Sequence, residues 1–158
     1  MIDYVLIKNI YICHIIKKTI LSRVLAIDYG QKRVGLAVTD PLQIIASALD
    51  TVHVKDIWDY LSTYLSKEKV EKILVGYPMQ MNNQPSQAVR FVNPFVKKLV
   101  KTYPDIMVEL VDERFTSKMA HQTVIDAGLK KKDRQNKELI DRISATIILQ
   151  SYLERRTK

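Results

Sequence analysis

The chain has a single cysteine, Cys13, and only three histidines among its 158 residues. One cysteine cannot form an internal disulfide or a cysteine-based zinc site, and the histidines do not show the spacing of metal ligands. These absences exclude a disulfide-stapled secreted domain and a zinc-finger module. We therefore expect a protein of a reducing, cytoplasmic compartment, and its chemistry must use other side chains.

Acidic residues are fewer than basic residues, because the chain has 17 Asp and Glu and 25 Lys and Arg. Its formal net charge is therefore +8. This excess favours an anionic partner such as nucleic acid, although a plain basic surface would give the same total. The composition, 47% hydrophobic and 27% charged, indicates a globular chain with enough apolar residues for one ordinary core.

Long uninterrupted hydrophobic runs are missing as well. The first 22 residues are apolar, but Lys8, His14, Lys17 and Lys18 break them into pieces too short to cross a bilayer. The positive charges fall inside and after the apolar stretch, unlike those of a signal peptide. We interpret residues 1–22 as an N-terminal extension outside the core, either disordered, an oligomerisation strand or the product of a start codon assigned too early. Residues 23–158 form the expected domain, and we expect no membrane association.

The periodicity predicts an α/β fold. Apolar runs at 23–29 and 34–39 flank a tight turn and predict a hairpin. Further strands are expected within 44–53, 71–78 and 106–115, and helices from residue 56, over about 86–103 with a kink or break at Asn93-Pro94, up to residue 127, and up to residue 155. All four glycines are placed at element boundaries: Gly30, Gly35, Gly76 and Gly128. Strands separated by helices require crossovers, so we predict a mixed five-stranded sheet with an antiparallel opening, parallel later strands and helices on both faces.

Two carboxylates end apolar strands. Asp28 closes the first strand, where an unpaired charge is costly, and Glu113 ends the strand in VELVDERF. Asp112 points to the opposite side from Glu113 because strand side chains alternate. If the two strands are parallel neighbours, their carboxyl ends meet at the edge where open α/β sheets bind ligands.

A third carboxylate, Asp141, shares an otherwise apolar helix face with Ala145 and Ile148. The small Ser144 and Ala145 would let this helix approach the sheet closely and bring Asp141 toward the strand ends. Three such acids without histidine or cysteine would suit Mg²⁺ or Mn²⁺. Two ions about 4 Å apart would stabilise the attacking and leaving oxygens of a phosphodiester cleavage. Taken singly, each acid also has an ordinary structural interpretation, such as a cap or, for Asp141, an ion pair with Arg142 or Lys137.

Three segments, AIDYGQKRVGLAV, VDERFTS and IDRISATIILQSYL, together with the strand end VGYP, resemble the signature blocks of the YqgF family, also called RuvX. The resemblance covers about residues 23–155. It implies an RNase H-like fold related to RuvC-type Holliday junction resolvases, in a cytoplasmic bacterial nuclease that processes the 5′ end of pre-16S rRNA. It also implies that the catalytic, metal-binding acids are Asp28, Glu113 and Asp141, the residues that the strand-end and helix-face arguments select.

Basic residues surround these blocks. By the resemblance, Lys32 and Arg33 match the family's hairpin and Arg114 its Asp-Glu-Arg block, and we interpret all three as phosphate-contacting or site-organising residues. Surface charge or ion pairing explains them equally well. A basic segment before the last helix would hold a phosphate backbone or form a solvated loop; it contains Lys130, Lys131, Lys132, Arg134 and Lys137.

The sequence therefore predicts a metal-dependent nuclease, with two Mg²⁺ or Mn²⁺ ions, that acts on structured RNA as a monomer or homodimer. Branched DNA is the alternative substrate, and a dimer would suit a two-fold junction. A strand, an Asp-x-Gly turn and a returning strand also resemble the phosphate hairpin of actin-like ATPases, but such enzymes need two copies and this chain holds one. A nucleic-acid-binding module without cleavage is the non-enzymatic alternative.

Overall fold

The computed structural model describes residues 22–79, 86–112, 116–126, 128 and 136–156. Five strands form one sheet in the order β3-β2-β1-β4-β5. Their bounds are β1 Arg23–Tyr29, β2 Arg33–Thr39, β3 Ala46–His53, β4 Val70–Tyr77 and β5 Met107–Asp112. β2 runs antiparallel to β1 and β3, whereas β1, β4 and β5 are parallel, so the mixed five-stranded sheet expected from the sequence is confirmed.

The sequence argument for the site considered the first strand and the strand in VELVDERF as parallel neighbours. They are not neighbours, because β4 lies between β1 and β5. The carboxyl ends of β1, β4 and β5 nevertheless share one edge of the sheet, since all three strands point the same way. A site at this edge must therefore reach across the end of β4.

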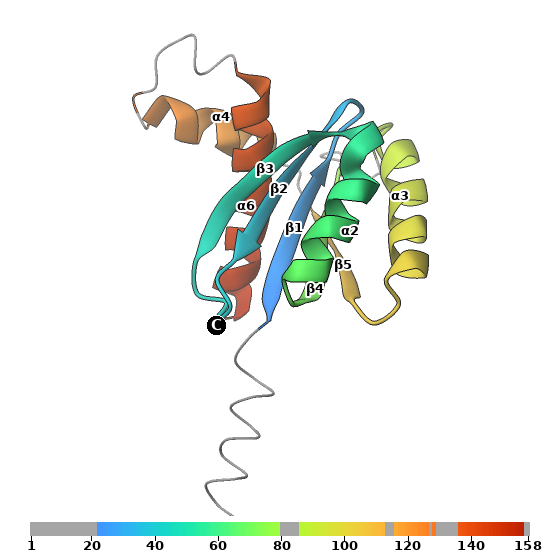
Figure 1. The fold of residues 1–158 in the computed structure, drawn as a ribbon. Helices are drawn as coiled ribbons and strands as arrows, with labels where there is room; N and C mark the ends of the chain where they lie inside the picture. Colours follow the sequence, from blue (N-terminus) through green and yellow to red (C-terminus); the bar gives the residue numbers. More distant parts are fainter. Residues whose placement is uncertain (1–21, 80–85, 113–115, 127, 129–135, 157–158) are drawn as a thin grey trace, which may run out of the picture.

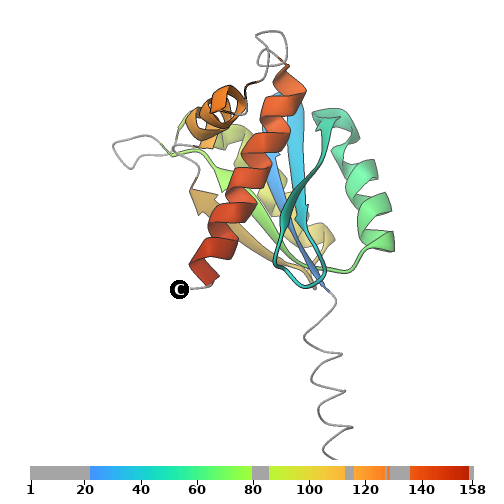
Figure 2. The same ribbon diagram turned by 90° about the vertical axis from the view of Figure 1, so that its left-hand side faces the viewer.

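Helices cover both faces of the sheet (Figures 1 and 2). The helical elements are η1 Val54–Asp56, α2 Ile57–Lys67, α3 Val89–Thr102, α4 Thr116–Asp126 and α6 Lys137–Arg156. On one face, α2 and α3 pack on alternate β1 residues such as Leu25 and Ile27. The intervening residues Val24 and Ala26 face α6 on the other side. This alternation is the two-residue period of a strand buried on both faces.

Two local expectations need correction. Helix α3 continues through Pro94 instead of ending there, so Asn93-Pro94 does not split it. Gly35 lies inside β2 and not at the hairpin turn, whereas Gly76 is the next-to-last residue of β4, close to the strand end expected for it. Gly128, at φ +67°, follows the end of α4 as expected.

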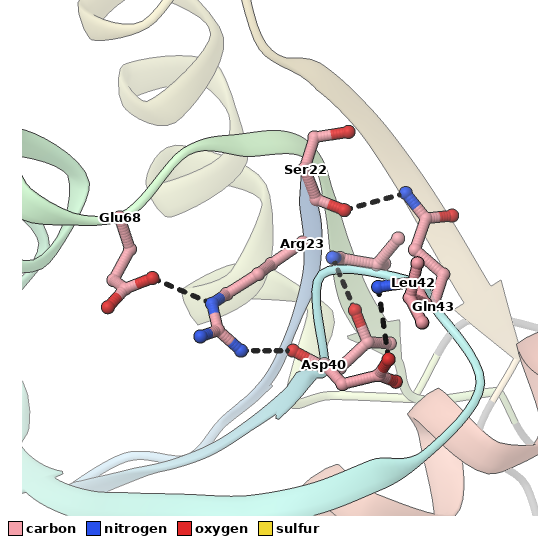
Figure 3. A network of polar contacts seen from close by, with 8 residues as sticks. Ser22, Arg23, Asp40, Leu42, Gln43 and Glu68 are labelled. Carbon is pink, nitrogen blue, oxygen red and sulfur yellow. Dashed lines mark hydrogen bonds and ion pairs between the residues drawn. The ribbon is translucent and has the colours of Figure 1, made fainter. Parts of the chain in front are cut away.

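A polar network closes the end of the sheet where the first described residue, Ser22, enters (Figure 3). The Arg23 guanidinium binds Glu68 at 2.7 Å and donates to the Thr39 carbonyl at 2.8 Å. The Asp40 carboxylate accepts three backbone N–H groups of the loop before β3, at 2.7 to 3.0 Å. Gln43 donates to the Ser22 carbonyl at 2.9 Å, with its own backbone at φ 57°. The loop before β3 is therefore held by the Asp40 carboxylate and by the Gln43 side chain.

None of the described helices is both long and apolar enough to span a membrane. Residues 1–21, which hold nearly all of the expected extension, lie outside the described residues.

Candidate active site at the carboxyl edge of β1

Asp28 is the sixth residue of β1 and pairs in register with Gly35 of β2. It follows Val24 and Ala26 on the strand face that α6 covers, and its side chain is partly buried there. The Ser144 hydroxyl of α6 hydrogen-bonds the Asp28 carboxyl group. Asp28 is thus held between the sheet and the helix that carries Asp141.

Close packing of α6 on β2 brings Asp141 near Asp28. A Cβ atom added at Gly35 would lie 2.1 Å from the Asp141 carbonyl oxygen, so only glycine accommodates the helix here. Ser144 and Ala145 are buried at the same crossing, as their small size predicts. Near the start of α6, the Thr51 hydroxyl of β3 donates to the Glu138 carbonyl at 2.9 Å. The position of Asp141 is therefore fixed by contacts of the α6 backbone with Gly35 of β2 and with the Thr51 side chain of β3.

Sequence reasoning missed this role of Gly35, which it assigned to the hairpin turn. A glycine in the interior of an apolar strand is itself a signal of close backbone approach. The strand in which Gly35 lies, Arg33–Thr39, begins directly after the turn, and this made the turn assignment attractive.

The two carboxylates affect each other electrostatically. Burial raises the pKa of Asp28, the negative charge of Asp141 raises it further, and the Ser144 hydrogen bond lowers it by less, so the pKa of Asp28 is about 7. A carboxyl group with this pKa is half protonated near neutral pH. A cation placed between the two acids would remove the repulsion and favour ionised Asp28.

Asp141 already has one cationic partner, Arg33 of β2. The Arg33 Nε atom lies 2.7 Å from Asp141 Oδ2, and the side chains are 31% and 25% exposed. The expected partners Arg142 and Lys137 are therefore wrong, because the salt bridge joins residues 108 positions apart. Surface charge and ion pairing were the two ordinary structural explanations for Arg33. The structure shows that Arg33 forms an ion pair.

A polar cavity of about 290 Å³ adjoins this salt bridge. It lies between the β1–β2 turn and the first turns of α6, and it is lined by Gly30, Gln31, Lys32, Arg33, Lys137 and Asp141. Within the described part of the chain, neither Lys32 nor Lys137 has a side-chain partner. The cavity thus presents positive charge that has no partner among the described side chains, beside Asp141.

The remaining predicted site residues are not placed. Glu113, Arg114, Lys130, Lys131, Lys132 and Arg134 lie outside the described residues. Asp112, at the end of β5, is exposed and pairs in register with Tyr77 of β4. Among the residues that the structure describes, no group of three or more His, Cys, Asp or Glu side chains is arranged to hold a metal ion. The described site is therefore a pair of acids with an arginine.

Comparisons with known proteins agree with the sequence blocks. A model of the RuvX family, described as "Holliday junction resolvase", matches residues 22–155. A protein of Phocaeicola vulgatus named "Putative pre-16S rRNA nuclease" is 63% identical over 134 residues, which cover 85% of this chain and 96% of that protein. A protein of Flavobacterium psychrophilum with the same name is 58% identical over 136 residues, covering 86% and 99%.

Among solved structures, Thermus thermophilus RuvC in complex with a Holliday junction substrate aligns with a TM-score of 0.49 at 15% identity, over 85% of this chain and 96% of that chain.

The family match spans most of the described fold, including β1, α6 and the residues between them. The chain therefore belongs to the RuvX family of nucleases.

Proposed function

We propose that this protein is a divalent-metal-dependent endonuclease that cleaves structured RNA in the 5′-end processing of pre-16S rRNA. The names of the relatives support the substrate, and the observation that carries the chemistry is the adjacency of Asp28 and Asp141 across Gly35. Such processing belongs to the cytoplasm, in line with the cysteine usage.

The described acids fit a hard divalent cation. Both candidate ligands are carboxylates, the donor type that Mg²⁺ and Mn²⁺ prefer. Burial, and then the negative charge of Asp141, raise the pKa of Asp28, and a bound cation would offset both effects. Among the described acids, Arg33 forms its salt bridge with Asp141 and not with Asp28. Asp28 and Asp141 would therefore hold the metal, and a second ion would need further ligands.

Glu113 is the proposed third ligand. Val111, two residues earlier, packs with Ala145 and Ile148 on the α6 face of the sheet. A strand period of two would direct position 113 to that same face, where Asp28 and Asp141 lie. Because β5 and β1 end at the same edge, such a side chain would need to reach across the end of β4.

When bound, divalent ions activate water and stabilise the leaving oxygen in phosphodiester hydrolysis. The residues of the chain supply the geometry. Ser144 orients the Asp28 carboxyl group, Gly35 lets α6 lie close enough to the sheet, and Arg33 holds the Asp141 carboxylate. The protein thus presents two pre-oriented acids at an open sheet edge.

The test compares cleavage of a pre-16S rRNA fragment and a four-way DNA junction by the wild type, with Mg²⁺ or Mn²⁺ and with chelator. We expect metal-dependent RNA cleavage, and we expect Asp28→Asn to slow it by at least about a thousandfold, since one metal ligand is lost. Asp59→Asn is the matched control, because this exposed aspartate lies on α2, on the opposite face of the sheet. RNA cleavage that survives Asp28→Asn would contradict the proposed site.

Holliday junction resolution is the second candidate, favoured by the description of the family model. Junction cleavage without RNA cleavage would select it, and it would also require a homodimer for symmetric cuts, whereas RNA processing is compatible with a monomer. If both nucleic acids bind with salt-sensitive affinity and neither is cut, the chain is a binding module.

A further inference from the structure

The cavity between the β1–β2 turn and α6 carries more positive charge than its own carboxylate balances. Among its described lining residues, Lys32, Arg33 and Lys137 contribute three cations and Asp141 is the single acid, already bound by Arg33. Neither lysine has a partner among the described side chains. Unpaired cations that converge on a small polar cavity favour a multiply hydrogen-bonding anion such as a phosphate group.

The walls of this cavity are held in place by backbone contacts. The Gly30 N–H donates to the Arg33 carbonyl at 3.0 Å, and the Val54 N–H donates to the Lys32 carbonyl at 3.1 Å. At the start of α6, the Asn136 side chain accepts the Glu138 N–H at 3.0 Å, and Thr51 binds the Glu138 carbonyl. A cavity fixed in this way is pre-organised for a ligand and does not have to fold around it.

Arg33 lies between this cavity and the acids. Its Nε donates to Asp141 Oδ2, and the rest of the guanidinium fork has no other partner among the described residues. A divalent ion on Asp141 would compete with Arg33 for the same carboxylate. An arginine released from a carboxylate retains a fork that matches phosphate oxygens.

We propose that the cavity binds one backbone phosphate of the nucleic acid, and that Arg33 couples this phosphate to the metal by exchanging Asp141 for the phosphate when the metal binds. The inference relies on the proposed function for its metal site. Arg33 is a positioning residue in the metal-free protein and a phosphate ligand in the loaded one. Metal and nucleic acid then bind cooperatively, because each takes one partner of the same salt bridge.

A backbone phosphate fits better than the phosphate of a free nucleotide. The cavity is polar, and apart from Gly30 and the aliphatic stems of long side chains its described lining offers no apolar or aromatic surface for a base. It is also adjacent to Asp141, so a chain that crosses the acids would pass directly over it.

The first experiment measures Mn²⁺ affinity of the nucleic-acid-free full chain from the electron paramagnetic resonance signal of free Mn²⁺. We expect Arg33→Gln to bind Mn²⁺ about two- to fivefold more tightly than the wild type, because a competing cation of a partly exposed salt bridge is removed. Arg33→Lys keeps the charge and should lie between the two. Lys137→Gln controls for general electrostatics and should change the affinity less than Arg33→Gln.

The second experiment measures RNA affinity with Ca²⁺ and with chelator, after a gel has shown that Ca²⁺ leaves the RNA intact. The wild type should bind more tightly with Ca²⁺, and Arg33→Gln should reduce this ratio several-fold. Lys137→Gln should weaken binding in both conditions and lower the salt slope by about 1. Lys101→Gln, an exposed lysine on α3, should leave both unchanged.

Three results would overturn the inference: equal Mn²⁺ affinity in Arg33→Gln and wild type, an unchanged Ca²⁺ ratio, or displacement of RNA by ATP or inorganic phosphate at concentrations close to that of the RNA. The last result would assign the cavity to free phosphate compounds. These readouts are independent of cleavage. A protein that shows the coupling but cuts no nucleic acid would refute the proposed function and leave this inference standing.

Discussion

The two ends of strand β2 differ in how their charges are satisfied. At the end that precedes β3, Asp40 accepts three N–H groups. At the same end, the Arg23 guanidinium binds Glu68 and donates to the Thr39 carbonyl (Figure 3). At the other end, Lys32 borders an open cavity without a partner among the described side chains, and the pKa of Asp28 is raised to about 7. One end of β2 thus lies in a network whose charged groups are paired, and the other end borders a cavity where Lys32 has no partner among the described side chains.

This difference separates stability from function. Polar groups that bond each other hold a loop in one conformation and have no capacity left for a ligand. Groups that stay unpaired, or that carry a shifted pKa, reduce stability and are typical of sites where a ligand completes the arrangement. The β1–β2 end should therefore respond to substitution in activity, and the β2–β3 end in stability.

Among changes that leave every charged group in place, the largest effect is expected from Gly35→Ala, which alters the close crossing of α6 over β2 beside the two acids. The new methyl group would overlap the Asp141 carbonyl, so α6 must move away from β2 and separate Asp141 from Asp28. We expect a loss of about 1 to 3 kcal/mol in the free energy of unfolding and at least a hundredfold loss of cleavage. Urea unfolding and cleavage rates measure both.

Gly128→Ala serves as the control, because a Cβ there meets no atom within 4 Å, although its φ of +67° gives some strain. It should cost stability without the same loss of cleavage. Equal cleavage by Gly35→Ala and wild type would show that the close crossing is not needed for the site.

The next effect is a dependence of stability on pH that originates at Asp28. Its pKa is about 7 in the folded chain and 3.8 in the unfolded chain, so between pH 4 and pH 7 the unfolded state loses a proton that the folded state keeps. Without metal, the contribution of Asp28 is therefore most favourable below pH 4, declines up to pH 7 and is constant above. The expected decline is about 2 to 3 kcal/mol, since water that reaches the carboxyl group screens part of the effect.

Urea unfolding at several pH values, in chelator, measures this decline. Asp28→Asn should remove it and be more stable than the wild type at pH 8, whereas Asp59→Asn should keep it. Parallel pH profiles for the wild type and Asp28→Asn would mean that Asp28 ionises freely in the folded chain.

The comparison of the two ends also shows what the sequence could and could not reveal. The period of two in β1 and the apolar face around Asp141 were sufficient to predict the strand, the helix and the close approach of that helix to the sheet. The pairing of Arg33 with Asp141 was not predictable, because it depends on where α6 crosses the sheet. The position of β4 between β1 and β5 was equally hidden, since strand order depends on helix packing and not on local periodicity. Gly35 was visible in the sequence but misinterpreted.

The smallest effect is expected at the closed end, from Asp40→Ala. The carboxylate accepts the N–H groups of Leu42, Ile44 and Ile45, and these bonds hold the pKa of Asp40 below its usual value. In the variant, water replaces the carboxylate, so we expect a loss of only about 1 kcal/mol in the free energy of unfolding and an unchanged cleavage rate. Asp40→Asn keeps one acceptor oxygen and should lose less. If Asp40→Ala instead slowed cleavage as strongly as Gly35→Ala, the two ends of β2 would be coupled through the strand, and the division between a stabilising end and a functional end would be wrong.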